Sequence, residues 1–243
     1  MYALTGPKSL ELVAATLLLC WADCSPSPQD ELAPLDVQFH SLDFRNVLHW
    51  KHPHKAVKNL TYFVQHKIYG DKEWINSEDC QGIQSLECDL SQATSDPREW
   101  YYARIRSFSS AGFSSWVLSH RFYPQWESTF SPPQIKVTVT GRIISVQIRP
   151  PRSPLRGEKG SRIRVTKLQK LKFRIYVMHN DVEETFTNPI FPKQEVYETD
   201  SCSKELVIEG LRPKTTYCLQ AVSVTPRSGR QSSRSPSTCI STH

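Results

Sequence analysis

The sequence predicts an all-β protein made of two tandem sandwiches joined at an elbow. Short runs of alternating apolar and polar residues fill both halves of the chain. Between them lies the stretch 121–133, RFYPQWESTFSPP, where Pro124, Pro132 and Pro133 fix the backbone and remove the donors that a continuous strand needs. A chain of 243 residues, less a leader, fits two sandwich domains of about 100 residues each.

The N-terminal segment 10–22, LELVAATLLLCWA, is apolar and follows the basic residue Lys8. Such a short block is typical of a secretory signal peptide, because a membrane span needs roughly 18 to 20 apolar residues. No later run reaches that length, so we expect a secreted, extracellular protein without a membrane span. The expected segments are a signal peptide over 1–24, a first domain over 32–124, an elbow linker over 125–130 and a second domain over 131–243.

The cysteines also favour an oxidising, extracellular compartment. The chain has 7 of them, and five lie beyond the leader. Cys80 and Cys88 enclose a short loop and are expected to form one disulfide bond. Cys218 opens one strand and Cys239 closes the next antiparallel strand, so their ends coincide and predict a second bond. Cys202 lies one strand earlier, at the expected opposite end of the sandwich, and is left unpaired.

Three β-patterned stretches, 37–50, 62–74 and 99–116, predict the strands of the first domain. The first suits a hairpin with one buried face. The second ends at Tyr69 and Gly70, where a large ring next to a residue without a Cβ suits contact with another protein. Alternation in the third stretch predicts a stack of charged and aromatic side chains on one face, formed by Arg104, Arg106 and Trp116.

Two smaller features of the first domain bear on its chemistry. His49, His52 and His54 cluster around a proline, but no fourth ligand of the right kind lies nearby, so we expect a solvated strand end and no metal. The sequence Asn59-Leu60-Thr61 is an acceptor for N-glycosylation and predicts a surface turn.

The second domain is predicted from a hairpin over 135–148, a central strand over 171–178 and two strands over 206–224. Leucine, proline, threonine and tyrosine in the last stretch have the spacing of a tyrosine corner, in which the phenol bonds to upstream backbone. These residues are Leu211, Pro213, Thr215 and Tyr217. The corner indicates that the sandwiches are fibronectin type III-like.

The stretch 149–174 carries ten basic side chains against Glu158 alone, whereas the whole chain has a net charge of only +6. The positive charge is therefore concentrated rather than general. It suits either a solvated face or a site for a sulfated glycosaminoglycan such as heparan sulfate. The residues that we assign to such a site are Lys167, Lys170 and Lys172. An extracellular adhesion module with this activity is our alternative function.

The sequence argues against an enzyme. It contains no nucleophile elbow, no phosphate-binding loop and no paired metal-ligand spacing, and its 9 glycines are scattered. We expect no catalytic residues, no cofactor and no nucleic-acid partner.

The order of several motifs resembles a class II cytokine receptor ectodomain over nearly the whole mature chain. These motifs are VQFHSLDFRNVLHW, TYFVQHKIYGDKEW, the Cys80 and Cys88 pair, CDLSQATSD, YYARIRSFSSAGFSSW, RFYP and LRPKTTYC. The resemblance implies a secreted, monomeric decoy receptor that captures a helical cytokine of the interleukin-10 superfamily, with interleukin-22 as the first candidate. Such a protein keeps the cytokine from membrane receptors.

The same resemblance implies a cytokine-binding surface at the elbow, formed by loops of both domains. In the first domain the matching positions are Lys67, Tyr69, Gly70, Thr94, Arg98, Glu99, Gly112, Phe113 and Arg121. In the second domain they are Leu168 and Gln169, although the stretch before the central strand reads VTKLQKLKF where relatives are acidic and aromatic.

Overall fold

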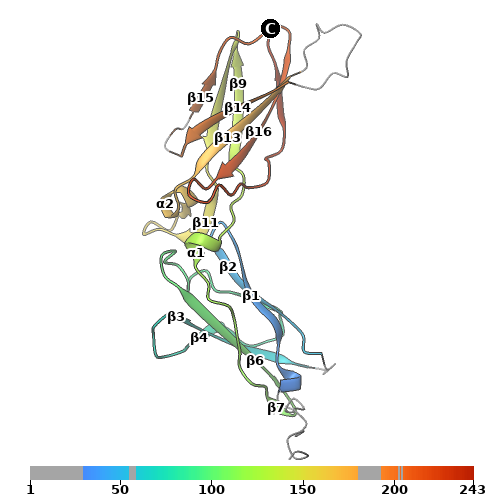
Figure 1. Cartoon of the computed structure of the whole chain (residues 1–243), viewed down its shortest axis with the longest axis vertical. Helices are drawn as coiled ribbons and strands as arrows, with labels where there is room; N and C mark the ends of the chain where they lie inside the picture. The colour runs from blue at the N-terminus through green and yellow to red at the C-terminus, as the bar shows by residue number, and fades with distance from the viewer. Residues whose placement is uncertain (1–29, 55–58, 180–192, 202, 204) are drawn as a thin grey trace, which may run out of the picture.

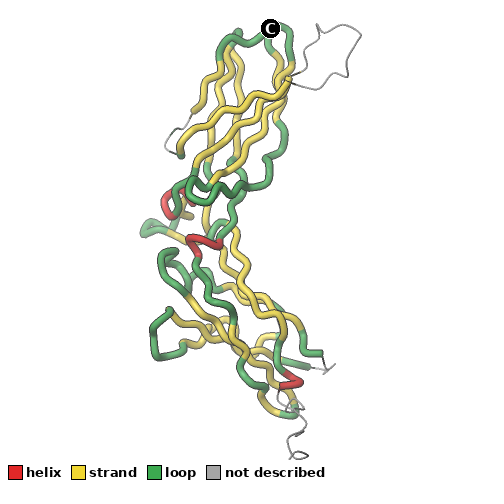
Figure 2. Tube along the Cα trace, in the orientation of Figure 1, coloured by secondary structure: helices red, strands yellow, loops and turns green. Residues whose placement is uncertain are grey.

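The computed structural model describes residues 30–54, 59–179, 193–201, 203 and 205–243. Figure 1 shows two β-sandwiches placed end to end, with the C-terminus at the far end of the second. Strands form most of both domains, and the two short α-helices lie at the elbow (Figure 2). The expected all-β fold of two tandem fibronectin type III-like domains is confirmed. The expected signal peptide and Cys202 lie outside the described residues.

The first domain has two facing sheets. One sheet has the order β1-β2-β5, with β1 (Leu35–Leu42), β2 (Arg45–Lys51) and β5 (Glu87–Asp89). The other has the order β4-β3-β6-β7, with β3 (Thr61–Ile68), β4 (Ile75–Ile83), β6 (Tyr101–Ser109) and β7 (Gly112–Phe113), and β8 (Val117–Leu118) also pairs with β6. A 3-10 helix, η1 (Asp30–Leu32), precedes β1. Leu48, Val64 and Ile105 are fully buried in the core between the sheets.

The outer face of β6 carries the expected stack of arginine and aromatic side chains. The guanidinium of Arg104 lies 4.3 Å from the ring centroid of Trp74 and 4.5 Å from that of Trp116. The guanidinium of Arg106 lies 4.5 Å from Trp116 and 3.8 Å from Phe113. Because each cation lies between two rings, these contacts tie β6 to the segments on both sides of it.

The second domain also has two facing sheets. One has the order β15-β10-β9, with β9 (Gln134–Thr140), β10 (Ile143–Arg149) and β15 (Glu205–Ile208). The other has the order β14-β13-β16-β17, with β13 (Lys172–His179), β14 (Lys193–Asp200), β16 (Thr216–Val224) and β17 (Thr238–Ser241). Val146, Ile175 and Leu219 are fully buried between them. The tyrosine corner is present, since the backbone N–H of Arg212 donates to the Tyr217 hydroxyl over 2.9 Å.

Two disulfide bonds join the pairs of cysteines that the sequence led us to expect. Cys80 on β4 bonds to Cys88 on β5, so this bond connects the two sheets of the first domain. Cys218 and Cys239 bond directly across the β16–β17 pair, where they are register partners.

A small hairpin and two short helices lie where the domains meet. The hairpin pairs β11 (Arg152–Arg156) with β12 (Arg162–Arg164), and α2 (Val165–Leu168) follows it directly. Helix α1 (Pro124–Glu127) begins at the first proline of the elbow stretch, as suits a residue without a backbone N–H. The expected linker over 125–130 thus begins inside this helix, and the domain boundaries stay a prediction.

The elbow is held by the two-residue turn between β1 and β2. Both turn residues are left-handed, with φ of 54° at Asp43 and 63° at Phe44. A phenylalanine in this region costs about 1–3 kcal/mol and persists only where surrounding contacts compensate. The carboxylate of Asp43 accepts hydrogen bonds from the Ser131 backbone N–H at 2.9 Å and from its hydroxyl at 2.6 Å. The polar half of the turn therefore binds the start of the second domain.

The apolar half of the turn enters a cluster shared by both domains. Phe44 is 1% exposed and packs on Phe130, with 5.6 Å between ring centroids, and on Val165 and Leu171 of the second domain. Leu168 packs against the same cluster. Backbone hydrogen bonds between the turn and the linker reinforce it, because the Asp43 N–H donates to the Thr129 carbonyl at 2.9 Å.

Removing the Phe44 ring should loosen the elbow. Phe44→Ala should lower the free energy of unfolding by about 3–5 kcal/mol, since truncating a buried aromatic leaves a cavity. Thermal unfolding measures this loss, and small-angle X-ray scattering should show a wider range of interdomain angles. The matched control is Leu42→Ala, because Leu42 is 51% exposed one residue before the turn; its effect should stay within about 0.5 kcal/mol. Equal effects of both changes would contradict this role of the turn.

Candidate functional site

Tyr69 lies at the elbow end of β3 with 57% of its surface exposed. Its backbone N–H donates to the Trp100 carbonyl at 2.7 Å, which fixes the position of the turn. Gly70 follows with φ of 95°, and a Cβ added there would meet no atom within 4 Å. The turn therefore presents a fixed aromatic ring beside open space into which another protein can approach.

Arg121 connects this ring to a second pair of aromatic residues. Its guanidinium lies 4.0 Å from the ring centroid of Trp100 and 5.4 Å from that of Tyr69. Trp100 in turn stacks on Tyr123, with 4.4 Å between centroids and 14° between planes. We call Tyr69, Trp100, Arg121 and Tyr123 the elbow aromatic cluster. Tyrosine, tryptophan and arginine are the residue types enriched in energetically dominant interface positions.

The elbow aromatic cluster continues into a groove of the second domain. Tyr123 lines this groove, about 190 Å³ in volume, together with Trp126 of α1, Gln169 after α2 and the loop 225–230. Trp126 is 57% exposed, and the Arg230 guanidinium donates to its backbone carbonyl. The Oε1 atom of Gln169 is buried without a hydrogen-bond partner among the described residues. The groove therefore combines an exposed indole with an acceptor that still lacks a donor.

Sequence reasoning missed three of these residues, Trp100, Tyr123 and Trp126. All three are aromatic, and Tyr123 and Trp126 lie within the elbow stretch 121–133, which was the available signal. Their spacing does not follow one strand face, however, because Trp100 precedes β6 and Trp126 lies in α1. Only the pairing of β6 with the segment at Phe122 brings them together.

Three other expected contact residues lie exposed or half-buried in the same part of the first domain. The Lys67 ammonium donates to the Asp71 carbonyl at 2.9 Å, across the turn that holds Tyr69. Arg98 forms a forked pair with Asp96, at 3.1 and 2.9 Å, and these hydrogen bonds lower the pKa of the Asp96 carboxyl. Glu99 is exposed next to them. These charges form a polar margin beside the elbow aromatic cluster.

The structure does not bring the other expected contact residues to this surface. Thr94 is 1% exposed, and its hydroxyl accepts from Asn46 at 2.7 Å and donates to the Leu90 carbonyl at 2.8 Å. Leu168 packs into the elbow core. Gly112 and Phe113 form β7 at the end of β6 opposite Tyr101, far from the elbow (Figure 1). The Phe113 ring is already engaged by the Arg106 guanidinium.

The remaining sequence predictions concern glycosylation, metal binding and membrane-spanning segments. Asn59 is exposed, as an acceptor for N-glycosylation has to be. Among the described residues no group of three or more histidine, cysteine or acidic side chains could hold a metal ion. The expected histidine cluster is divided, since His52 bonds to the Tyr62 hydroxyl at 2.9 Å and His49 lies 3.6 Å from Glu87. Within the described part of the chain, no helix is long and apolar enough to cross a membrane.

Two tandem fibronectin type III-like domains with an exposed aromatic surface at their elbow define a protein-binding module, and comparison with known families identifies its class. Residues 10–116 match the family "Tissue factor", and residues 128–243 match "Interferon-alpha/beta receptor, fibronectin type III". The chain belongs to the class II cytokine receptor family.

Individual relatives support this assignment. The chain is 33% identical to the interleukin-22 receptor subunit alpha-2 of Rattus norvegicus over 235 residues, covering 96% of this chain and 98% of the relative. It is 31% identical to the interleukin-20 receptor subunit alpha of Homo sapiens, covering 97% of this chain but 40% of the relative. The solved structure of a chicken interferon gamma receptor alpha chain shares the fold, with a TM-score of 0.65 at 20% identity over 86% of this chain and 98% of that chain.

The contact between Arg121 and Trp100 can be measured directly. A double-mutant cycle with Arg121→Ala and Trp100→Ala should give a coupling energy of about 0.5–1 kcal/mol in urea unfolding, as expected for a cation–π contact at an exposed site. The matched control pairs Trp100→Ala with Arg45→Ala, whose guanidinium binds Asp89 on the other sheet. That pair should be additive. Additivity in both cycles would mean that Arg121 does not organise the elbow aromatic cluster.

Proposed function

We propose that this protein is a secreted cytokine receptor that captures a helical cytokine of the interleukin-10 superfamily, with interleukin-22 as its ligand, and acts as a decoy. The observation that carries this proposal is the elbow aromatic cluster, an exposed set of anchor residues at the junction of two receptor-family domains. The relatives that the chain covers almost end to end are interleukin-22 receptor subunits alpha-2, which supports the choice of ligand.

The elbow surface suits the side of a helix in a folded cytokine. Tyr69 projects beside Gly70, so a partner helix can come close to the backbone while the ring fills a gap between its side chains. Arg121 and Trp100 restrict the ring before binding, which reduces the entropy lost on association. A protein–protein interface of standard size buries about 800 Å² on each partner, so the interface with the cytokine must extend beyond these residues.

The second domain contributes the groove between α1 and the loop 225–230. We assign Trp126 and Gln169 to the contact surface. Leu168, which the family resemblance also implied as a contact, instead supports the elbow from inside. The unpaired Oε1 of Gln169 is satisfied when the cytokine places a donor in the groove, because an unmet buried acceptor costs about 1–3 kcal/mol. Thr94, another contact position implied by the resemblance, supports its own loop by accepting a hydrogen bond from Asn46.

The decoy role rests on similarity to the interleukin-22 receptor subunit alpha-2 of Rattus norvegicus, to which the chain is 33% identical over 98% of that relative's length. The disulfide bonds of the chain suit an oxidising, extracellular compartment. A receptor that holds the cytokine in solution lowers the free concentration available to membrane receptors by mass action.

Removing the Tyr69 ring tests the binding surface. Tyr69→Ala should weaken capture of interleukin-22 by about 30-fold to 1,000-fold, because truncating a central aromatic anchor typically costs 2 to 4 kcal/mol. The melting temperature should change little, since the ring is 57% exposed. Surface capture kinetics and thermal unfolding on the same preparation measure both quantities.

The matched control for this test is Phe113→Ala, which removes another exposed aromatic ring from the same domain at the end away from the elbow. It should leave capture unchanged. Loss of capture in Phe113→Ala but not in Tyr69→Ala would place the binding surface at the opposite end of the domain. Failure of the unmodified protein to capture interleukin-22 or any related helical cytokine would overturn the proposed function itself.

The decoy role has its own test. At a protein concentration about 100 times Kd, the interleukin-22 concentration that gives a half-maximal reporter response in cells should rise roughly 100-fold. Tyr69→Ala protein should not produce this shift. If the unmodified protein captures the cytokine and yet leaves the response unchanged or increases it, the protein acts as a carrier rather than a decoy.

A further inference from the structure

The hairpin β11–β12 at the elbow carries four exposed arginines, Arg152 and Arg156 on one strand and Arg162 and Arg164 on the other. Arg152 is the register partner of Arg164, and Arg156 is the partner of Arg162. Side chains of antiparallel partners project to the same side of a sheet. Arg162 and Arg164 are two residues apart on β12, so the two pairs share one face, although a register shift separates them along β11.

This arrangement works against the stability of the hairpin. Like charges directly opposite each other on antiparallel strands are destabilising, and a two-stranded hairpin has little stability of its own. Within the described part of the chain, no carboxylate forms an ion pair with any of the four guanidinium groups. Arg156 donates instead to the Gly160 carbonyl at 2.7 Å, and Arg152 makes a long contact of 3.4 Å with the Arg162 carbonyl. Asp43, Asp89 and Glu127 line a hollow together with Arg152 and Arg162, but each of these carboxylates already accepts a hydrogen bond from another residue. The four exposed arginines are therefore open to an anionic ligand.

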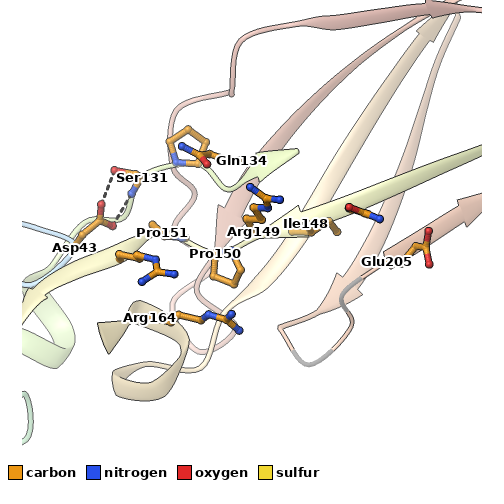
Figure 3. A pocket seen from close by; sticks show the side chains of 12 residues that line it. Asp43, Ser131, Gln134, Ile148, Arg149, Pro150, Pro151, Arg164 and Glu205 are labelled. Atoms are coloured by element: carbon orange, nitrogen blue, oxygen red, sulfur yellow. Dashed lines mark hydrogen bonds between the residues drawn. The ribbon is translucent and has the colours of Figure 1, made fainter. Parts of the chain in front are cut away.

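Arginine side chains also line a cleft beside the hairpin. It encloses about 770 Å³, and Arg149, Arg152 and Arg164 line it together with the amides of Gln134 and Gln147 (Figure 3). All five can donate hydrogen bonds to anionic oxygens. The cleft is open to solvent rather than enclosed, and it adjoins the hairpin face, so an extended ligand can occupy both.

Two acidic residues also line this cleft. Asp43 is engaged by Ser131 through both carboxylate oxygens, as Figure 3 shows. Glu205 lines the cleft from β15 in the second domain. The three arginines that line the cleft outnumber its two carboxylates, and the Asp43 carboxylate already accepts two hydrogen bonds. The local field at the cleft is therefore positive.

The lysines that the sequence analysis assigned to a glycosaminoglycan site are less suited than these arginines to binding an anion. Lys172 lies beside Glu198, whose pKa is lowered chiefly by its hydrogen bond with Arg174 and further by the charge of Lys172. The register partners of Lys172 and Arg174 on β14 are Asp200 and Glu198, so acidic side chains line that part of the basic run. Lys170 lines the groove of the proposed cytokine surface instead of the arginine cleft.

We propose that the face of β11–β12 and its adjoining cleft bind a sulfated glycosaminoglycan. Guanidinium groups recognise planar sets of anionic oxygens through paired hydrogen bonds, and an extended polyanion can bridge several arginines at once. No large exposed apolar side chain lies between Arg149 and Arg164, so the face has nothing to insert into a lipid bilayer and no ring to stack on a nucleic-acid base.

This site is separate from the proposed cytokine surface. None of the residues that line the arginine cleft lines the groove at Trp126 and Gln169. Binding to cell-surface or matrix polysaccharide is therefore compatible with capture of a protein partner, and it would hold the receptor near the cells that secrete it. The inference does not depend on the identity of the cytokine.

The test is binding of the full secreted chain to immobilised heparin across a range of salt concentrations. The double variant Arg152→Gln/Arg164→Gln should weaken binding by about tenfold or more, and should make the fall in affinity with salt shallower, because two charges no longer displace counterions. Both side chains are exposed and repel each other across the hairpin, so the melting temperature should not fall. If this variant nevertheless unfolds, Arg149→Gln/Arg156→Gln removes two other charges of the same surface and takes its place.

The matched control is Lys167→Gln/Lys170→Gln, which removes the same number of charges from the same basic run. It should bind heparin nearly as the unmodified protein does. Equal losses in both double variants would overturn the proposed site, since they would show that only total charge matters. Unchanged binding to heparin from which the sulfates have been removed, or tighter binding to vesicles of anionic phospholipid than to heparin, would also overturn it.

Discussion

The turn formed by Asp43 and Phe44 is the constraint on which the shape of this receptor depends. It holds two consecutive residues in left-handed backbone conformations, and neither is glycine. The compensation comes from the other domain, through the hydrogen bonds between Asp43 and Ser131 and through the packing of Phe44 on Phe130, Val165 and Leu171. Contacts with the second domain thus stabilise a strained turn of the first, which couples the local backbone geometry to the arrangement of the two domains.

The arrangement of the two domains decides which side chains share the surface at the elbow. Tyr69, Trp100 and Tyr123 come from three segments of the first domain, whereas Gln169 and the loop 225–230 belong to the second. These groups form one continuous surface only because the elbow holds both domains in place. The Arg121 guanidinium, lying over two of the rings, orients the exposed aromatic side chains in the absence of a partner. The proposed binding surface is therefore preorganised by contacts within the elbow aromatic cluster itself and by the packed core of the elbow.

The basic side chains of the molecule divide into those that form ion pairs and those that do not. Ion pairs such as Arg45 with Asp89 and Arg174 with Glu198 neutralise several basic side chains where strands of opposite charge lie next to each other. The two strands of the β11–β12 hairpin pair only with each other, so no ladder partner places an acidic side chain opposite its arginines. Its arginines therefore remain available, and the molecule presents an aromatic surface and a cationic surface on different sets of residues.

The sequence by itself determined the fold class, the two sandwiches, the disulfide-bonded pairs and the position of Tyr69, because period-two alternation, proline placement and strand-end spacing are local properties of the chain. The sequence placed Thr94 and Phe113 at the elbow surface, whereas Thr94 is buried and the exposed Phe113 lies at the other end of the domain. Both positions depend on which strands pair. The sequence also could not separate the arginines of β11–β12 from the lysines of the same basic run, which are close in sequence but face different neighbours. Only the tertiary structure decided these points, because burial, ion pairing and the continuity of a surface are set by residues distant in sequence.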